Sequence, residues 1–158
     1  LNRVPIPADN IHRMRGELPP EQAAREYARQ LAQHFGCGPD EIPIFDLIVL
    51  GMGADGHTAS LFPGAQLSPS HPLVAPVSPP RAKPHVARLT LTPMLINAAR
   101  EILFMISGAD KHPMLRAIRT GDRTPPASRI DVRPQSWYLC PALTDNNPSS
   151  HGRSHGRF

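Results

Sequence analysis

A histidine that directly follows a glycine-rich turn is the clearest candidate for chemistry in this sequence. His57 ends the segment GMGADGH, two residues after Asp55 and shortly after an apolar run that ends at Leu50. Imidazole titrates near neutral pH, so it can take a proton from water and return it to a leaving group. Asp55 can orient the ring or bind sugar hydroxyls. A histidine that merely hydrogen-bonds the turn fits the same residues equally well.

The turn before His57 is built on three glycines, Gly51, Gly53 and Gly56. Glycine permits positive φ and close approach of a ligand to the backbone. Exposed N–H groups ahead of a helix favour anionic oxygen atoms. Tight strand-to-helix connections also need glycine for structural reasons. The turn alone therefore fits both an anion site and a purely structural role.

Alternating strands and helices are expected to position this turn. Phe45–Leu50 and Glu101–Ile106 are short and apolar, as is typical of parallel strands buried on both faces. Further strands are predicted at Leu73–Val77, Arg88–Leu91 and Ser136–Leu139, and helices at Glu21–Phe35, Thr92–Ala99 with Thr92 as N-cap, Lys111–Arg119 and from Thr58. This order predicts an α/β fold with a mainly parallel sheet, whose ligands bind beyond the carboxyl ends of the strands.

Composition narrows the class of protein. The chain has 158 residues, 40% of them hydrophobic, which suits one folded domain, while the tail from Pro141 lacks periodicity and is expected to be disordered. The formal net charge is only +4, and no basic run with interleaved aromatic residues indicates nucleic-acid binding. No apolar stretch approaches the roughly 18 residues of a membrane span. Cys37 and Cys140 lack metal or disulfide spacing, so free thiols in a reducing cytosol are expected.

The segment GMGADGHTASLFP at 51–63 resembles the signature of the 6-phosphogluconolactonase family, which usually reads GMGPDGHTASLFP. Further landmarks of the family follow in the same order, namely ADNIHRMRGE at 8–17, RLTLTPMLINAAR at 88–100, GADK at 108–111, PPASRI at 125–130 and SWYL at 136–139. Glucosamine-6-phosphate deaminases share a GxGxDGH turn but continue with IAFNEP-like residues. Thr58–Pro63 therefore favours the lactonase.

This resemblance implies a modified Rossmann-like sheet flanked by helices, of the kind shared by glucosamine-6-phosphate deaminases and ribose-5-phosphate isomerases. It implies hydrolysis of 6-phospho-D-glucono-1,5-lactone to 6-phosphogluconate, the second step of the oxidative pentose phosphate pathway. The reaction would run in the cytoplasm, without a metal or an organic cofactor, on a small-molecule substrate and with no nucleic-acid or membrane partner. The implied site comprises His57 as general base, Asp55 as its acidic neighbour, Gly51, Gly53 and Gly56 against the substrate, and Lys83 and Arg88 on the phosphate.

Taken without the family pattern, several of these residues have simpler explanations. Lys83 and Arg88 resemble ordinary solvated surface charges. Asp110 is expected to cap the following helix rather than to act in catalysis. Trp137 and Tyr138 are expected to pack in the core rather than to stack on a sugar.

The sequence also departs from the family pattern. The N-terminal part of the family, with its first strands and an SGGSTP-like phosphate loop, has no counterpart here, so residues 1–140 are expected to be the C-terminal portion of a lactonase domain. Half a parallel sheet is expected to expose an edge and an apolar face. Cys140 stands where the family usually has Asp, and Ala54 where it has proline. Two alternatives stay open: a sugar-phosphate-binding or oligomerisation module without turnover, and an amino-sugar phosphate deaminase.

Overall fold

The structure is a computed structural model that describes residues 4–68, 70–78, 86–140 and 156–157. Its 3₁₀ helices are η1 (Ala8–Asn10), η2 (Ala109–Lys111) and η3 (Pro126–Arg129), and its α-helices are α1 (Pro20–Phe35), α2 (Pro93–Asn97) and α3 (His112–Arg119). Its strands are β1 (Ile48–Leu50), β2 (Val74–Val77), β3 (Arg88–Leu91), β4 (Ile102–Ile106), β5 (Gln135–Leu139) and β6 (Gly156–Arg157).

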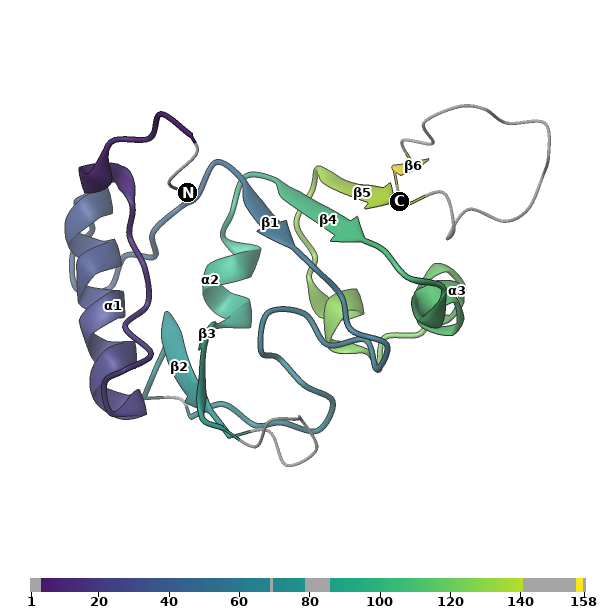
Figure 1. The fold of residues 1–158 in the computed structure, drawn as a ribbon, viewed down its shortest axis with the longest axis horizontal. Helices are drawn as coiled ribbons and strands as arrows, with labels where there is room; N and C mark the ends of the chain where they lie inside the picture. Colours follow the sequence, from purple (N-terminus) through teal and green to yellow (C-terminus); the bar gives the residue numbers. More distant parts are fainter. Residues whose placement is uncertain (1–3, 69, 79–85, 141–155, 158) are drawn as a thin grey trace.

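The main sheet confirms the expected α/β class. Its strand order is β1-β4-β5-β6, and the pairs β1–β4 and β4–β5 are parallel whereas β6 runs antiparallel to β5 (Figure 1). The register places Leu50 opposite Phe104 and Phe104 opposite Trp137. The rings of Phe104 and Trp137 stack at 4.2 Å with their planes 19° apart. Parallel pairing brings the carboxyl ends of β1 and β4 to the same edge of the sheet, where the glycine turn begins.

Only one face of this sheet is buried in the described structure. The buried side chains of the strands form one core with residues from α2, α3 and the η3 region, including Ile96, Leu115 and Ala127. On the opposite face, the exposed fractions are 52% for Val49, 52% for Met105 and 50% for Tyr138. The expectation that strands 45–50 and 101–106 are buried on both faces is therefore wrong, because no described element covers this side. The apolar face expected of half a sheet is present.

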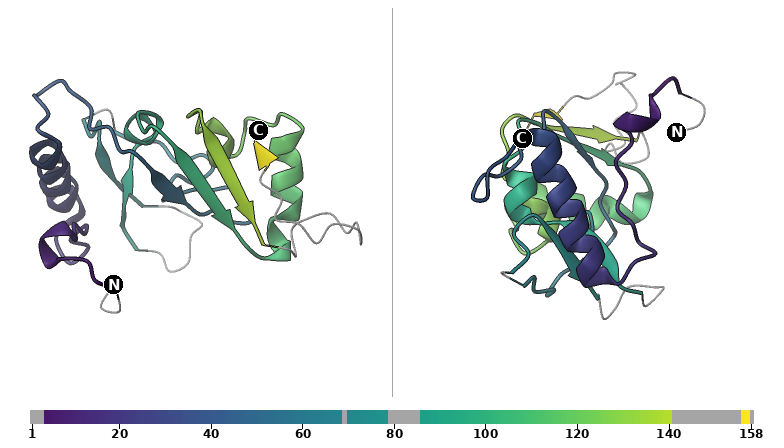
Figure 2. Two further views of the ribbon diagram at one scale, coloured as in Figure 1. Left: turned by 90° about the horizontal axis from the view of Figure 1, so that it is seen from above. Right: turned by 90° about the vertical axis from the view of Figure 1, so that its left-hand side faces the viewer.

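A second, smaller layer packs at one end of the molecule. β2 and β3 form an antiparallel hairpin, and α1 lies against it at the opposite end from α3 (Figure 2). α1 contributes Ala24 and Leu31 to a cluster with Val74. The helix begins with Pro20 in its first turn, where a missing N–H costs nothing, and it ends at Gly36, whose φ of 65° is left-handed.

The loop before β2 is also fastened to α1. His71 is almost fully buried, and its Nε2 lies 2.6 Å from Oε2 of Glu21 on α1.

None of the helices in the described ranges is both long and apolar enough to cross a bilayer.

Most elements match their predicted positions, and three of the expectations differ from the structure. No helix begins at Thr58; Thr58 and Leu61 instead form an isolated antiparallel bridge around Ala59, whose φ of 48° is incompatible with a right-handed helix. The first strand is limited to Ile48–Leu50, because its partner β4 begins only at Ile102.

The third difference concerns the start of α3. Asp110 makes no capping hydrogen bond there and pairs instead with Lys111. Thr92 is confirmed as the N-cap of α2, because its Oγ1 accepts a hydrogen bond from the N–H of Leu95 at 3.3 Å. The tail expected from Pro141 lies outside the described residues, apart from the two residues of β6.

Candidate active site

The glycine turn after β1 is closed by its own backbone hydrogen bonds. The N–H of Gly53 donates to the carbonyl oxygen of His57 at 2.9 Å, and the N–H of Gly56 donates to that of Gly53 at 3.0 Å. The N–H of His57 donates to Oδ1 of Asp55 at 3.1 Å. These three N–H groups are therefore occupied within the turn, and they cannot also serve an oxyanion unless the turn opens.

The glycines act here through the space that they leave. A Cβ built on Gly53 would lie 2.2 Å from both Cε1 and Nδ1 of His57, so only glycine lets the imidazole fold back over the turn. Gly56 has a φ of 79°, and a Cβ there would lie 2.6 Å from Cβ of Pro125 and 2.9 Å from Sδ of Met114. Its carbonyl oxygen accepts a hydrogen bond from the N–H of Ala127 at 3.0 Å. The turn is thus fitted tightly against α3 and η3.

Asp55 and His57 form a directly bonded pair. Nδ1 of His57 lies 2.6 Å from Oδ1 of Asp55, with side-chain exposed fractions of 30% for His57 and 51% for Asp55. Partial burial opposes ionisation of Asp55, but the hydrogen bonds from the ring and the backbone N–H of His57 outweigh it, so the pKa of Asp55 lies below its ordinary value. An ionised carboxylate only accepts hydrogen bonds. Nδ1 therefore carries a proton, and Nε2 is the ring nitrogen that can accept a proton from water.

The segment after His57 anchors the turn from behind. Thr58 is fully buried, and its Oγ1 donates to the carbonyl oxygen of Gly51 at 2.8 Å. The N–H of Ser60 donates to Oγ1 of Thr90 on β3 at 3.1 Å. These bonds fix the glycine turn to the neighbouring hairpin, so the position of His57 depends on two separate strands.

Phe62 is a site residue that the sequence patterns did not single out. Its ring centroid lies 4.5 Å from that of His57, with the planes 31° apart, and Cζ of Arg88 lies 5.4 Å from the same ring. The structure thus brings Arg88, from the start of β3, to the side of His57 through Phe62. The position of Phe62 inside the TASLFP segment was the feature of the sequence that could have indicated it. Its contacts, however, depend on the turn at Thr58–Leu61.

Lys83, the other basic candidate, lies outside the described residues. In the PPASRI segment at 125–130, Ser128 is buried and its Oγ donates to the carbonyl oxygen of Pro125, while Arg129 donates to the carbonyl oxygens of Arg123 and Thr124. Both side chains therefore hold their own loop. In the described ranges, no three His, Cys, Asp or Glu side chains are grouped as metal ligands.

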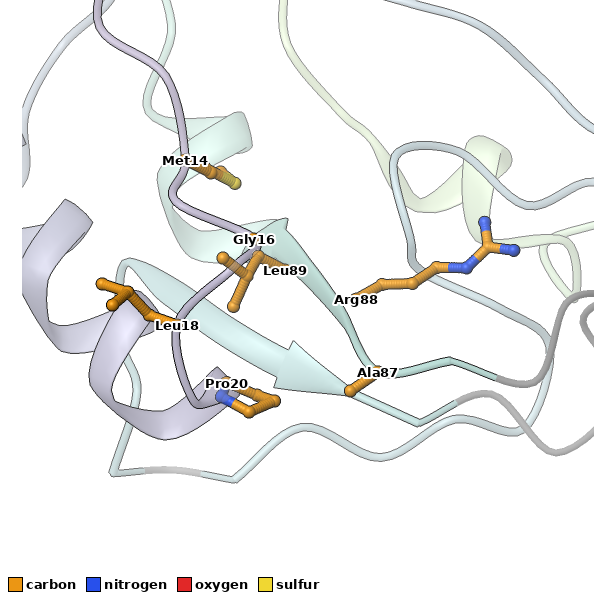
Figure 3. Close-up of a pocket in the computed structure, with 7 residues that line it drawn as sticks. All are labelled: Met14, Gly16, Leu18, Pro20, Ala87, Arg88 and Leu89. Atoms are coloured by element: carbon orange, nitrogen blue, oxygen red, sulfur yellow. The ribbon is translucent and has the colours of Figure 1, made fainter.

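A hollow of about 220 Å³ lies on the other side of β3 and is lined by Met14, Gly16, Leu18, Pro20, Ala87, Arg88 and Leu89. Figure 3 shows the Arg88 side chain extending away from the other six lining residues. Its guanidinium therefore belongs with Phe62 and His57 rather than with this mainly apolar hollow.

Comparison with known proteins identifies the family. The sequence model of the family described as glucosamine-6-phosphate isomerases/6-phosphogluconolactonase matches residues 1–139. The chain belongs to this family. The glycine turn, Asp55, His57 and Phe62 all lie inside the matched range.

Individual members of the glucosamine-6-phosphate isomerase/6-phosphogluconolactonase family agree with this result. Human 6-phosphogluconolactonase is 41% identical over 141 residues, which cover 89% of this chain and 54% of the human protein. The crystal structure of devB protein superposes with a TM-score of 0.78 at 34% identity, covering 90% of this chain and 60% of the other. The 6-phosphogluconolactonase of Trypanosoma cruzi superposes with a TM-score of 0.73 at 29% identity, covering 89% and 61%. The chain thus spans about half the length of the curated relatives it matches.

Proposed function

We propose that this site hydrolyses 6-phospho-D-glucono-1,5-lactone to 6-phosphogluconate, with His57 as the general base. The observation that carries the proposal is the bonded pair of Asp55 and His57 beside a glycine turn at the carboxyl edge of a parallel sheet. The family membership and the relatives called 6-phosphogluconolactonase support the choice of substrate.

The geometry provides a route for each proton. Nε2 of His57 accepts a proton from a water molecule while the water oxygen bonds to the carbonyl carbon of the lactone. When the tetrahedral intermediate collapses, the bond from that carbon to the ring oxygen breaks, and the imidazolium returns its proton to the departing oxygen. Asp55 stabilises the transient imidazolium through Nδ1. One water is consumed, and neither a metal ion nor an organic cofactor takes part.

Substrate binding requires a cation for the phosphate. Among the residues that the structure describes, Arg88 is the candidate for this cation, because its guanidinium lies next to the Phe62 ring, which contacts His57. A guanidinium can bind a phosphate through two parallel hydrogen bonds. Lys83 belongs to the same basic segment of the sequence, and we assign it to the phosphate on that ground alone. A phosphate fixed at one end holds the lactone carbonyl near His57 at the other.

A binding or oligomerisation module without turnover is the main alternative. It is favoured by the apolar face of the sheet that no described element covers. A deaminase acting on amino-sugar phosphates is disfavoured by the Thr58–Pro63 segment.

The test compares two proteins, residues 1–158 and a chimera in which residues 1–139 replace the matched part of the human relative. Turnover of freshly made 6-phosphogluconolactone is measured against its spontaneous hydrolysis. We expect slow turnover by residues 1–158, because positioning accounts for about 7–11 kcal/mol of a barrier and these residues match only 54% of the human relative. In the chimera, His57→Gln should lower kcat by about 10²–10⁴. If the His57→Gln variant of the chimera has the same kcat as the unsubstituted chimera, His57 is not the general base.

A further inference from the structure

Phe62 is held beside His57 by a short and well-anchored reversal of the chain. The N–H of Leu61 donates to the carbonyl oxygen of Thr58 at 2.8 Å, and Ala59 takes a left-handed conformation. Thr58 and Leu61 are both buried on either side of the reversal. The chain therefore returns toward His57 in a fixed path, and Phe62 is the first residue to leave the reversal.

The ring of Phe62 contacts the two groups on which the proposed reaction depends. It packs on the imidazole at 4.5 Å between centroids, and the guanidinium carbon of Arg88 lies 5.4 Å from its centroid. Aromatic rings attract cations through their faces and prefer inclined or offset contact with other rings. One rigid side chain therefore limits the positions of both the imidazole and the guanidinium.

A purely structural role does not account for this placement. Leu61, the preceding residue, already fills the core, whereas Phe62 is only half-buried. A phenyl ring has no hydrogen-bonding group, so it can hold His57 without competing for its proton. Its face also favours the positively charged imidazolium that forms during proton transfer.

We propose that Phe62 is a positioning residue that sets the separation of the His57 imidazole and the Arg88 guanidinium, and thereby selects lactones that carry a phosphate. This inference rests on the proposed function, because it assigns the imidazole to the lactone carbonyl and the guanidinium to the phosphate. A fixed separation of the two groups matches a substrate whose carbonyl and phosphate lie at opposite ends of one sugar. A lactone without the phosphate gains nothing from the second contact.

The experiment uses residues 1–158 with three substitutions. Phe62→Leu removes the ring and keeps apolar bulk, and Phe62→Tyr keeps the ring. Phe35→Leu is the matched control, because Phe35 also packs on an aromatic ring, that of Phe45 at 4.9 Å, but lies on α1. NMR follows the imidazole signals of His57 through a pH titration and the guanidinium signals of Arg88. Binding of 6-phosphogluconate and of gluconate is measured with the same samples.

If Phe62 positions both groups, Phe62→Leu shifts the His57 and Arg88 signals, moves the titration midpoint of His57 and weakens 6-phosphogluconate binding by about 3- to 30-fold. Gluconate binding stays the same, Phe62→Tyr restores wild-type behaviour, and Phe35→Leu changes none of these quantities. The inference is overturned if Phe62→Leu leaves both sets of signals and the preference for 6-phosphogluconate unchanged, or if Phe35→Leu alters them equally.

The NMR result can be interpreted whether or not the protein hydrolyses the lactone. If residues 1–158 and the chimera described above both fail to hydrolyse the lactone, the proposed function fails. The signals of His57 and Arg88 still decide whether Phe62 positions them. If the chimera is active and Phe62→Leu in it raises KM for the phosphorylated and the unphosphorylated lactone by the same factor, selection by Phe62 is refuted while the activity is retained.

Discussion

Replacing Gly53 by alanine is expected to abolish the Asp55–His57 arrangement without unfolding the chain. A Cβ at this position would lie 2.2 Å from Cε1 and Nδ1 of His57 and 2.8 Å from Oδ1 of Asp55. Carbon atoms in contact normally lie about 3.5–4.0 Å apart. The imidazole must therefore move by more than about 1 Å, which breaks its 2.6 Å hydrogen bond to Asp55.

The size of the effect follows from this displacement. A misplacement of about 1 Å near the reacting atoms can cost about 10²-fold in rate. Losing a hydrogen bond to a charged group adds about 1.5–3 kcal/mol, which corresponds to a further factor of about 10 to 10². We therefore expect kcat/KM of the chimera to fall by at least about 10²-fold on Gly53→Ala. Stability should change little, because alanine restricts the unfolded chain and the displaced ring can turn into solvent.

Gly51→Ala is the matched control for this prediction. It lies in the same turn, but the nearest atom to its Cβ would be the carbonyl oxygen of Met105 at an ordinary 4.0 Å. The assay measures lactone hydrolysis and thermal unfolding for both variants of the chimera. If Gly53→Ala hydrolyses the lactone at a rate close to that of Gly51→Ala, the steric reasoning for this turn is refuted.

Three further substitutions test neighbouring parts of the site. Asp55→Asn should lower kcat by about 10²–10⁴, because the carboxylate that holds the proton on Nδ1 of His57 is lost, while KM should stay nearly unchanged. Because the pKa of Asp55 is lowered in the folded state, its stabilising effect is present above the ordinary carboxyl value of about 3.9 and is lost as pH falls through the folded pKa. Urea unfolding of wild type and Asp55→Asn should therefore converge in acid, and a gap that persists at the lowest pH would contradict this. Gly56→Ala should lower the free energy of unfolding by about 1–3 kcal/mol through its positive φ and its contacts with Pro125 and Met114, and an unchanged denaturation midpoint would argue against that strain. Arg88→Met should raise KM for the phosphorylated lactone about tenfold or more and leave that for gluconolactone unchanged, whereas equal losses would make Arg88 structural.

Local sequence patterns predicted the elements whose causes are local. The predicted bounds of strand β3, Arg88–Leu91, are confirmed, and polar and apolar residues alternate within them. Thr92 was identified as an N-cap because its hydroxyl needs only the backbone three residues ahead. The glycine turn was likewise located by its position after an apolar run.

Features that depend on distant contacts could not be predicted in this way. Phe62 meets Arg88 across 26 positions only because Ala59 reverses the chain, and no periodicity indicates a left-handed alanine. The apolar run around Val49 indicated a buried strand, but whether both faces are covered depends on what packs on the sheet. The role of Gly53 as a space for the imidazole required the folded position of His57.

The stacking of Trp137 on Phe104 makes the intrinsic tryptophan fluorescence of this protein informative about its sheet. Trp137 is the single tryptophan of the chain, is 5% exposed, and donates its Nε1–H to Oε1 of Gln135 at 2.9 Å. Because its ring lies on Phe104 at the β4–β5 junction, its emission reports on whether these two parallel strands are paired. A shift of that emission to longer wavelength signals opening of the sheet, while ligand-induced changes confined to the turn at His57 leave it unaffected. In residues 1–158, intrinsic fluorescence can therefore separate loss of the scaffold from loss of the site for each substitution described above.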